Sequence, residues 1–411
     1  MSTLQKQTTV DGTKLLSVLC PLIYFGSYIT RKNYAIVIAE IIAFEGIGEA
    51  DAALADTLAL ISYGIGQIVS GVLGDKFKPR NLITCGLTAT TIINFLMALI
   101  PDPYIRAVLW CINGFAQSMM WPPLVRIMAA SMDEEAYSKT CVNVNVAGIS
   151  GTVFIYLTAS LVWIPYFSWK HVFYFSAFLC CIIDLLWIFL SKKTPQPGPT
   201  IRKKKEPAPE NKLSKKALLS SGILFIAVAI IMQGMLRDGV STWVPSFMME
   251  TFGMDSNSAI LKSVLIPIIG MLFLKIAQLV QKKFVSDEIL AAATIFTAGL
   301  AFSIVLFFCY DKNEYISLAL AAIITGCMHG VNLFLVCVVP AKFEKYGIVS
   351  TMSGLINSLT YVGSALATEG FALTKQYAGW TVTIGSWLVI AAIGILCCLL
   401  AYKPWKKFKT E

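Results

Sequence analysis

Apolar stretches of about 20 residues or more recur from one end of this chain to the other. A helix needs about 20 apolar residues to cross the hydrocarbon core of a bilayer. Backbone groups in lipid must bond to one another, which only helices and closed barrels allow. The stretches are too long and too continuously apolar for barrel strands of roughly ten residues. The sequence therefore predicts an all-α membrane protein.

About twelve such stretches fit within the 411 residues if the loops are short. Charged residues make up 14% of the chain, against roughly 25% in a soluble domain. Because Lys and Arg mark the cytoplasmic side, an even number of spans with basic loops on alternate turns predicts that both termini are cytoplasmic. The transmembrane helices are expected at about 15–44, 53–74, 81–100, 104–130, 138–163, 170–191, 218–249, 258–283, 288–310, 315–340, 348–375 and 380–402.

The net charge of +9 is distributed unevenly. Basic residues gather in the loop 74–81, in the segment 192–217 and in the C-terminal tail, whereas residues 40–56 carry acidic side chains and no Lys or Arg. This pattern is the topology signal of a multi-pass membrane protein. It is not interpreted as nucleic-acid binding, and the expected location is the plasma (inner) membrane, in contact with the lipid bilayer.

The segment 192–217 interrupts the apolar pattern with Pro, Lys and Glu. Such a composition cannot bury a core, so a flexible cytoplasmic linker is predicted there. The linker separates residues 1–191 from residues 218–411, and each part would hold six spans. The predicted fold is a pair of pseudo-symmetric six-helix bundles.

The sequence does not predict an enzyme. Its 11 cysteines lie almost entirely inside apolar stretches, without the paired spacing of a disulfide framework or a zinc site. We find no catalytic constellation, no glycine loop that would cradle a phosphate and no cluster of metal ligands. An enzyme and an ATP-driven pump are therefore disfavoured, and no cofactor or metal is expected.

A short motif lies between the second and third expected spans. The residues read Gly71-Val-Leu-Gly-Asp75-Lys76-Phe-Lys-Pro79-Arg80. They resemble the G-x-x-x-D-[RK]-x-x-x-[RK] loop of the major facilitator superfamily, in which two six-helix bundles rock about a site at the middle of the membrane. Asp75 and Arg80 would then belong to a charge cluster that opens and closes with the cytoplasmic gate. The alternative is a loop that is merely positive on the cytoplasmic side.

Two arginines are expected deep in the membrane. Arg31 lies about 16 residues past the cytoplasmic start of the first span, which is about 24 Å along a helix. Arg237 lies just past the middle of the seventh span. A charge at this depth costs at least about 2.5–3.5 kcal/mol on insertion scales and is a functional candidate by default. Because spans 1 and 7 are equivalent in a six-plus-six repeat, we interpret both arginines as anion ligands, with structural ion pairs as the alternative.

The chemistry of arginine suggests how such a site would work. The guanidinium stays charged, and its planar fork matches an oxyanion in two simultaneous hydrogen bonds. Two such groups facing each other across an empty cavity repel, and a dianion between them removes the repulsion. The loaded carrier would then reorient more readily than the empty one, which predicts exchange of one anion for another.

Three longer motifs carry a closer resemblance. The first span contains Tyr24-x-x-x-Tyr28-x-x-Arg31-Lys32-Asn33, the fourth contains Asn113-Gly114-x-x-Gln117-x-x-x-Trp121-Pro122-Pro123-x-x-Arg126, and the seventh contains Arg237-x-Gly239-x-x-x-Trp243-x-Pro245. Together with Tyr63 and Tyr361 they resemble the organophosphate:phosphate antiporter family, which includes glycerol-3-phosphate and hexose-6-phosphate transporters. The resemblance implies a phosphate group held by Arg31 and Arg237 and surrounded by tyrosines. The expected substrate ligands are Arg31, Arg237, Tyr24, Tyr28, Tyr63, Tyr361, Gln67, Asn145 and His329.

Several positions depart from the family pattern. Gln67 stands where the family usually has a lysine, and Val144 stands where it has a histidine, with Asn145 retained. Gly234 replaces a tyrosine, and Thr242 replaces an acid. These changes predict a site that is roomier and less positive than in a typical family member.

Further polar residues in the expected spans are assigned by position. Lys32 is rotated by about 100° from Arg31 and is expected to pair with Asp238 at the outer gate. His329, near the middle of the tenth span, is interpreted either as a ligand that replaces the missing histidine or as a packed core residue. Asp184 and Glu369 are candidates for proton coupling, although hydrogen bonds between helices are the commoner role for such residues.

The predicted function is secondary active transport by alternating access. The leading hypothesis is exchange of a small phosphorylated organic anion for inorganic phosphate, by a monomer that binds no nucleic acid. The first alternative is a proton- or sodium-coupled symporter of another organic anion, such as a sugar acid or carboxylate. A second alternative is a transporter-like membrane sensor of sugar phosphate.

Overall fold

The computed structural model describes residues 3–195 and 214–410, and every element within them is a helix. The predicted all-α class is therefore confirmed. Most of the predicted linker, residues 196–213, lies outside the described residues.

The chain divides into two compact units. Unit 1 comprises Met1–Pro207 together with Phe343–Leu355, and unit 2 comprises Ala208–Lys342 together with Ile356–Glu411. The short segment Phe343–Leu355 thus belongs to unit 1, although it comes late in the sequence. The bounds predicted for the two bundles remain a prediction.

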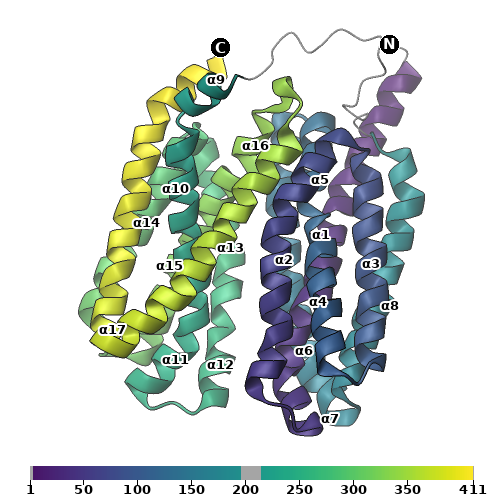
Figure 1. Cartoon of the computed structure of the whole chain (residues 1–411). Helices are drawn as coiled ribbons and strands as arrows, with labels where there is room; N and C mark the ends of the chain where they lie inside the picture. The colour runs from purple at the N-terminus through teal and green to yellow at the C-terminus, as the bar shows by residue number, and fades with distance from the viewer. Residues whose placement is uncertain (1–2, 196–213, 411) are drawn as a thin grey trace. The chain divides into compact units, whose positions relative to one another are not determined.

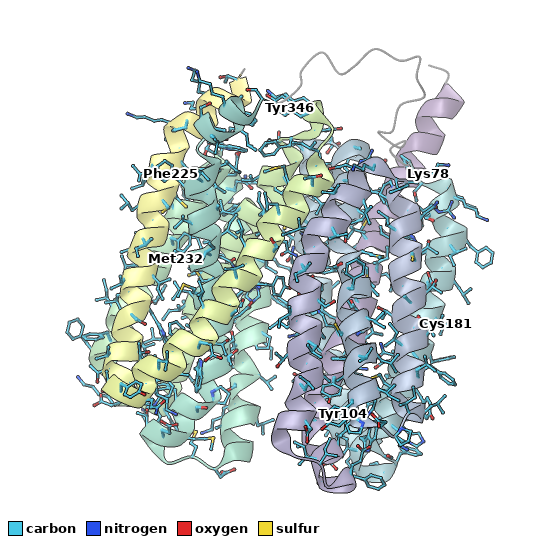
Figure 2. All side chains as sticks on the ribbon, viewed as in Figure 1. Lys78, Tyr104, Cys181, Phe225, Met232 and Tyr346 are labelled. Carbon is cyan, nitrogen blue, oxygen red and sulfur yellow. The ribbon has the colours of Figure 1, made fainter. Side chains whose placement is uncertain are left out.

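Unit 1 is a bundle of long helices joined by short connections (Figure 1). Lys78 and Tyr104 mark its two opposite ends (Figure 2). Its elements are α1 (Thr3–Glu45), α2 (Glu49–Lys76), α3 (Pro79–Leu99), α4 (Pro103–Ser118), α5 (Trp121–Ser131), α6 (Glu134–Thr158), η1 (Ala159–Trp163), α7 (Ile164–Tyr166), α8 (Trp169–Leu190), η2 (Ser191–Lys193) and η5 (Glu344–Tyr346).

Unit 2 is built in the same way and ends in the longest helix of the described chain. Its elements are α9 (Lys215–Ser220), α10 (Ile223–Gly234), η3 (Met235–Gly239), α11 (Val240–Phe252), α12 (Ser256–Ser263), α13 (Leu265–Lys283), α14 (Glu288–Cys309), α15 (Glu314–Asn332), η4 (Leu333–Val338), α16 (Val339–Ala341) and α17 (Val349–Thr410), whose first turns belong to unit 1.

Ten helices in the described residues are long and apolar enough to cross a membrane. The expected fourth span is absent from these ten because a break at Met119 and Met120 divides it into α4 and α5, each too short on its own. The helix α17 covers two expected spans, since Gly379 kinks it with a φ of 75°. The structure therefore agrees with twelve spans.

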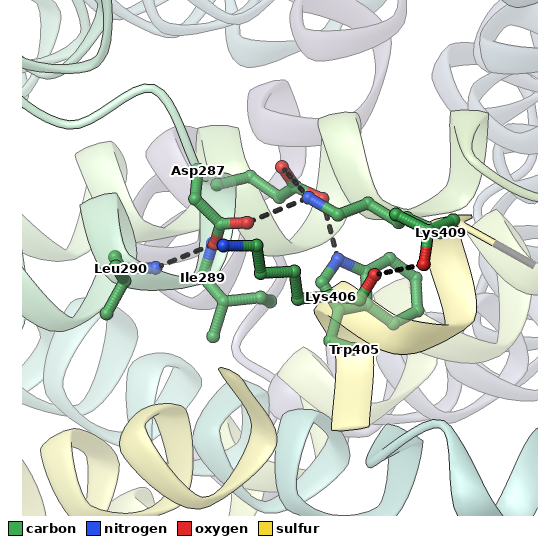
Figure 3. Close-up of polar contacts among 8 residues, drawn as sticks. Asp287, Ile289, Leu290, Trp405, Lys406 and Lys409 are labelled. Atoms are coloured by element: carbon green, nitrogen blue, oxygen red, sulfur yellow. Dashed lines mark hydrogen bonds and ion pairs between the residues drawn. The ribbon is translucent and has the colours of Figure 1, made fainter. Parts of the chain in front are cut away.

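Polar side chains fasten the C-terminal end of α17 to the start of α14 within unit 2. The Lys409 Nζ lies 2.8 Å from Asp287 Oδ2 and 3.0 Å from Glu288 Oε2. The Trp405 Nε1 donates to Glu288 Oε1 at 2.6 Å (Figure 3). Buried carboxylates are tolerated when they are paired and hydrogen-bonded, so this cluster gives the end of the helix one defined position.

Glycines allow α10 and α17 to pack closely in unit 2. A Cβ atom at Gly234 would lie 2.2 Å from the Thr360 carbonyl oxygen, and one at Gly363 would lie 2.1 Å from the Ile231 carbonyl oxygen. Small residues permit such close approach of membrane helices. The expectation that Gly234 enlarges the substrate site is wrong, because the backbone of α17 fills that space.

We expect Gly234→Ala to destabilise the protein by about 1–3 kcal/mol, since the added methyl group would force two backbones apart. Gly370→Ala on α17 is the control, because nothing lies within 4 Å of its Cβ position. Thermal unfolding of the purified protein measures both effects. A melting temperature for Gly234→Ala as high as that of the control would contradict the close packing.

Candidate functional site

Arg31 lies between two tyrosine rings in unit 1. Its Cζ is 4.3 Å from the centroid of the Tyr28 ring and 4.6 Å from that of the Tyr63 ring. A guanidinium over an aromatic face is stabilised by about 0.5–2 kcal/mol, more when the pair is desolvated. Tyr28 comes from the same helix and Tyr63 from α2, so two helices fix the position of the charge.

Tyr24 and Tyr28 of α1 pack against α6 at a glycine, Gly148. A Cβ atom at Gly148 on α6 would lie 2.9 Å from Tyr24 Cδ1 and 2.9 Å from Tyr28 Cε2. The ring of Tyr24 is 5.1 Å from the rings of both Tyr28 and Trp121. The predicted shared face of Tyr24, Tyr28 and Arg31 is therefore packed along α6 and α5, and Tyr24 itself is buried.

Buried hydrogen bonds fix the neighbouring face of α1. The Ser27 Oγ donates to Gln117 Oε1 at 2.5 Å, and Gln117 Nε2 donates to Thr30 Oγ1 at 2.9 Å. The Asn33 Nδ2 donates to Asn94 Oδ1 at 2.7 Å. A helix held by such bonds to α3 and α4 cannot rotate freely, so they fix the direction in which Arg31 points. Gln117 belongs to the motif of the fourth expected span, and no pattern in the sequence predicted this role.

Arg237 is paired with its sequence neighbour in unit 2. Its Nε donates to Asp238 Oδ1 at 2.6 Å, and its Nη2 donates to Asp238 Oδ2 at 2.7 Å. The hydroxyl of Ser364 on α17 also donates to Asp238 Oδ2. The structure therefore shows the ion pair that was the alternative interpretation of Arg237, and its role as an anion ligand remains a prediction.

A local irregularity of the helix allows this pairing. Residues Met235–Gly239 form a π-helical turn between α10 and α11. Neighbouring side chains on an α-helix point about 100° apart, and the wider π turn reduces that angle. The Ser241 hydroxyl donates to the Arg237 carbonyl oxygen at 2.7 Å. Single π turns are frequent at functional sites, and this one contains both Arg237 and Asp238.

His329 belongs to the same region of unit 2. It lies on α15, within the electrostatic reach of Arg237 and Asp238, and its ring occupies the space where a Cβ atom of Gly270 would stand, 2.8 Å from His329 Cδ2. The adjacent Met328 carbonyl oxygen accepts a hydrogen bond from Gln233 on α10 at 3.1 Å. This environment agrees with the interpretation of His329 as a packed core residue. Its role as a substrate ligand remains a prediction.

The remaining predicted ligands Gln67, Tyr361 and Asn145 lie on α2, α17 and α6. Gln67 is buried on α2, one turn after Tyr63. Tyr361 lies one turn before Ser364 on α17, so the two share a face. The Asn145 Nδ2 donates to the Cys141 carbonyl oxygen of its own helix at 2.8 Å. The roles of these residues in binding remain predictions.

Asp75 connects three helices of unit 1. Its carboxylate accepts hydrogen bonds from the backbone N–H groups of Ser350 at 3.0 Å and Thr351 at 2.7 Å, at the start of α17. The Arg126 Nε on α5 lies 3.8 Å from Asp75 Oδ1. A carboxylate at a helix N-terminus is stabilised by the orphan N–H groups and the dipole there. The predicted gate residue Arg80 instead donates to the Ile188 carbonyl oxygen on α8 at 2.8 Å.

The predicted gate pair of Lys32 and Asp238 joins residues of different units and remains a prediction. Lys32 is exposed on α1, and Asp238 is bonded to Arg237. If the pair forms during transport, Lys32→Asp and Asp238→Lys should each abolish activity and the double variant should recover at least a tenth of it. A double variant as inactive as the single variants would contradict the pair. Uptake into proteoliposomes is the measurement.

The two candidates for proton coupling, Asp184 and Glu369, lie in different environments. Thr88 donates to Asp184 Oδ2 at 2.6 Å and so connects α3 with α8, as the packing interpretation expected. Glu369 is exposed on α17. Among the residues that the structure describes, no three His, Cys, Asp or Glu side chains are grouped as metal ligands.

Among the described residues, ten helices are long and apolar enough to cross a bilayer, which indicates a multi-pass membrane protein. A family model described as Major Facilitator Superfamily matches residues 22–368. The chain therefore belongs to the Major Facilitator Superfamily, whose members are membrane transporters.

Individual relatives agree with this assignment. The "Glycerol-3-phosphate transporter" of Bacillus subtilis is 25% identical over 410 residues, which cover 94% of this chain and 90% of the relative. The "Membrane sensor protein UhpC" of Escherichia coli is 23% identical over 397 residues, covering 92% and 90%. These relatives match the organophosphate:phosphate antiporter family, so the predicted resemblance is confirmed. The fold is similar to that of the Escherichia coli fucose:proton symporter FucP, with a TM-score of 0.72 at 13% identity over 97% of this chain and 99% of that chain.

Proposed function

We propose that this protein exchanges a small phosphorylated organic anion for inorganic phosphate across the plasma membrane by alternating access, with both termini in the cytoplasm. The observation that carries the proposal is the placement of Arg31 between the rings of Tyr28 and Tyr63. The similarity to the Bacillus subtilis glycerol-3-phosphate transporter supports the phosphorylated class of substrate.

The chemistry of the site favours a phosphate group as the bound anion. A guanidinium presents N–H donors in a planar fork that matches two oxygens of a phosphate at once. The rings of Tyr28 and Tyr63 lie over the guanidinium, and tyrosine hydroxyl groups can donate to further phosphate oxygens. Arg31 and Arg237 would each bind the anion, and Tyr24, Tyr28, Tyr63 and Tyr361 would surround it.

Exchange follows from the cost of an empty site. A cation in a membrane interior is costly, and a bound anion lowers that cost, so the site would reorient more readily when an anion occupies it. Binding energy is thereby used to lower the barrier of the conformational step, as in other carriers with alternating access.

Reconstitution into proteoliposomes tests the proposal. Vesicles loaded with unlabelled phosphate should take up labelled phosphate, and vesicles without internal phosphate should not. Organic phosphates inside should replace internal phosphate when they are substrates. Uptake that needs no internal anion and collapses with a proton uncoupler would contradict exchange and favour a symporter of another organic anion.

A sensor is the second candidate, because one relative is named a membrane sensor. A sensor would bind the anion without moving it. Saturable phosphate binding by the purified protein, combined with the absence of exchange in vesicles that hold correctly folded protein, would identify this function.

A further inference from the structure

We propose that Asp238 is a built-in counter-ion of Arg237, which competes with the carried anion and so limits how tightly that anion is bound. This inference rests on the proposed function, because it concerns the anion that Arg237 would bind. It treats the ion pair and the anion contact as two states of one guanidinium, which is bonded to Asp238 in the first state and to the anion in the second.

The first observation is the edge of Arg237 that Asp238 occupies. A guanidinium has five N–H donors in a fixed plane, and the edge formed by Nε and Nη2 is one that can hold an oxyanion through two parallel bonds. Both atoms donate to Asp238, at 2.6 and 2.7 Å. An anion that binds Arg237 must therefore displace Asp238 from this edge or lie beside its negative charge, and either event lowers the affinity.

The second observation is that the backbone keeps the competitor close. Asp238 directly follows Arg237 in the π-helical turn Met235–Gly239, and the Ser241 hydroxyl bonds to the Arg237 carbonyl oxygen at 2.7 Å. A partner held next to its site acts at a high effective concentration. Once displaced, the carboxylate stays within reach and can take the place of the anion as it leaves.

The third observation is that a second helix of unit 2 holds the carboxylate. The Ser364 hydroxyl on α17 donates to the same Asp238 oxygen that accepts from Arg237 Nη2. Hydrogen bonds to an ionised group are stronger than those between neutral groups. The side chain of Arg237 is 14% exposed and that of Asp238 is 34% exposed, so solvent screens the pair only in part.

The consequence is a moderate affinity with rapid release. The apparent affinity for a ligand falls with the fraction of molecules whose site is competent to bind it. Each molecule in which Asp238 occupies the edge of Arg237 lowers that fraction. A carrier must release its anion on the other side of the membrane, so a counter-ion of its own assists turnover at the expense of affinity.

Equilibrium binding of labelled inorganic phosphate to the purified protein tests the inference. Asp238→Asn keeps the shape of the side chain and removes its charge. It should lower the dissociation constant of phosphate by about tenfold, because a unit charge a few ångströms away in a partly screened site is worth at least that factor. If Asp238 only supported the fold around Arg237, its loss would weaken binding instead.

Transport gives a second readout that a purely structural role would not produce. In proteoliposomes, Asp238→Asn should reach half-maximal phosphate exchange at a lower concentration than the wild type. Its maximal rate should be no higher, because differences in affinity appear mainly in the rate of release.

Glu250→Gln is the matched control. Glu250 is also a carboxylate of unit 2 in an ion pair, with Lys375 at 2.5 Å, and its replacement should leave the dissociation constant within about twofold of the wild type. A general effect of removing negative charge from unit 2 would appear in this control as well.

The outcomes separate this inference from the proposed function. No phosphate binding by the folded wild type or by folded Asp238→Asn would contradict both. If the wild type binds phosphate and Asp238→Asn binds it less than about threefold more tightly, or more weakly, the role of Asp238 is wrong and the proposed function stands.

Ser364→Ala decides the question if Asp238→Asn does not fold. It removes one of the hydrogen bonds that hold the Asp238 carboxylate and should tighten phosphate binding by about threefold, since a charge-assisted bond that favours the paired state is lost. Binding as weak as that of the wild type, or weaker, would overturn the inference.

Discussion

Arg31→Lys should reduce phosphate exchange by about 100-fold or more. Lysine keeps the positive charge but replaces a planar fork with a compact ammonium on a flexible stem. The two directed bonds that we propose between Arg31 and the phosphate would become one or none, and the stacking of the planar guanidinium against Tyr28 and Tyr63 would be lost with them. A factor of 100 corresponds to about 2.7 kcal/mol, a plausible loss for one bidentate, charge-assisted contact in a desolvated site.

The initial rate of labelled phosphate uptake into phosphate-loaded vesicles measures this effect. Lys14→Arg at the exposed end of α1 is the control for a basic substitution on the same helix, and it should leave the rate within about twofold of the wild type. Tyr63→Phe keeps the ring and should cost much less than the loss of the guanidinium. A rate for Arg31→Lys close to that of the control would remove Arg31 from the site.

Glu45→Gln should destabilise unit 1 by about 3–5 kcal/mol, because it leaves the buried guanidinium of Arg106 without its charged partner. Arg106 is 2% exposed, and its Nη1 donates to Glu45 Oε1 at 2.7 Å while its Nη2 bonds to the other carboxylate oxygen. The Arg106 Cζ also lies 5.3 Å from the ring of Trp169. Breaking a buried ion pair by removing one partner leaves the other charge uncompensated, which is the costly case.

Thermal unfolding should show this loss as a decrease in Tm on the order of 10 °C. The control is Glu135→Gln, which breaks an ion pair with Lys139. This pair is exposed, since the side chain of Glu135 is 66% exposed and that of Lys139 is 59% exposed. Exposed pairs contribute at most about 1 kcal/mol, so the control should unfold near the wild-type temperature. Replacing both partners, as in Glu45→Leu with Arg106→Met, should recover much of the lost stability. Equal melting temperatures for Glu45→Gln and the control would contradict the claim that the buried pair of Glu45 and Arg106 stabilises unit 1.

The helices could be predicted from the sequence because the bilayer demands a long apolar run for each span. The break at Met119 and Met120 was not predicted. The residues on both sides of it are apolar or belong to one motif, and this pattern is typical of a continuous span. The spacing of three between Tyr28 and Arg31 predicted their contact. The partnership of Arg31 with Tyr63 was predicted only through the family resemblance, because it depends on how α1 and α2 pack.

The partners of the charged residues were harder to predict. Asp238 directly follows Arg237, and regular helix geometry separates adjacent side chains, so their ion pair required the π turn, which has no clear signal in the sequence. Glu45 and Arg106 are 61 residues apart, and no local pattern connects them. The signal that could have identified this pair was an arginine at the start of an otherwise apolar span, facing a region rich in acidic residues.

Equilibrium binding of labelled phosphate to the purified protein tests the central claim most directly, because it separates the ligands of the anion from the steps of transport. The wild-type protein should bind phosphate saturably, and Arg31→Lys and Arg237→Lys should each weaken binding by about 100-fold while both variants stay folded. Wild-type affinity in either variant would contradict the claim that one arginine from each half holds the carried anion.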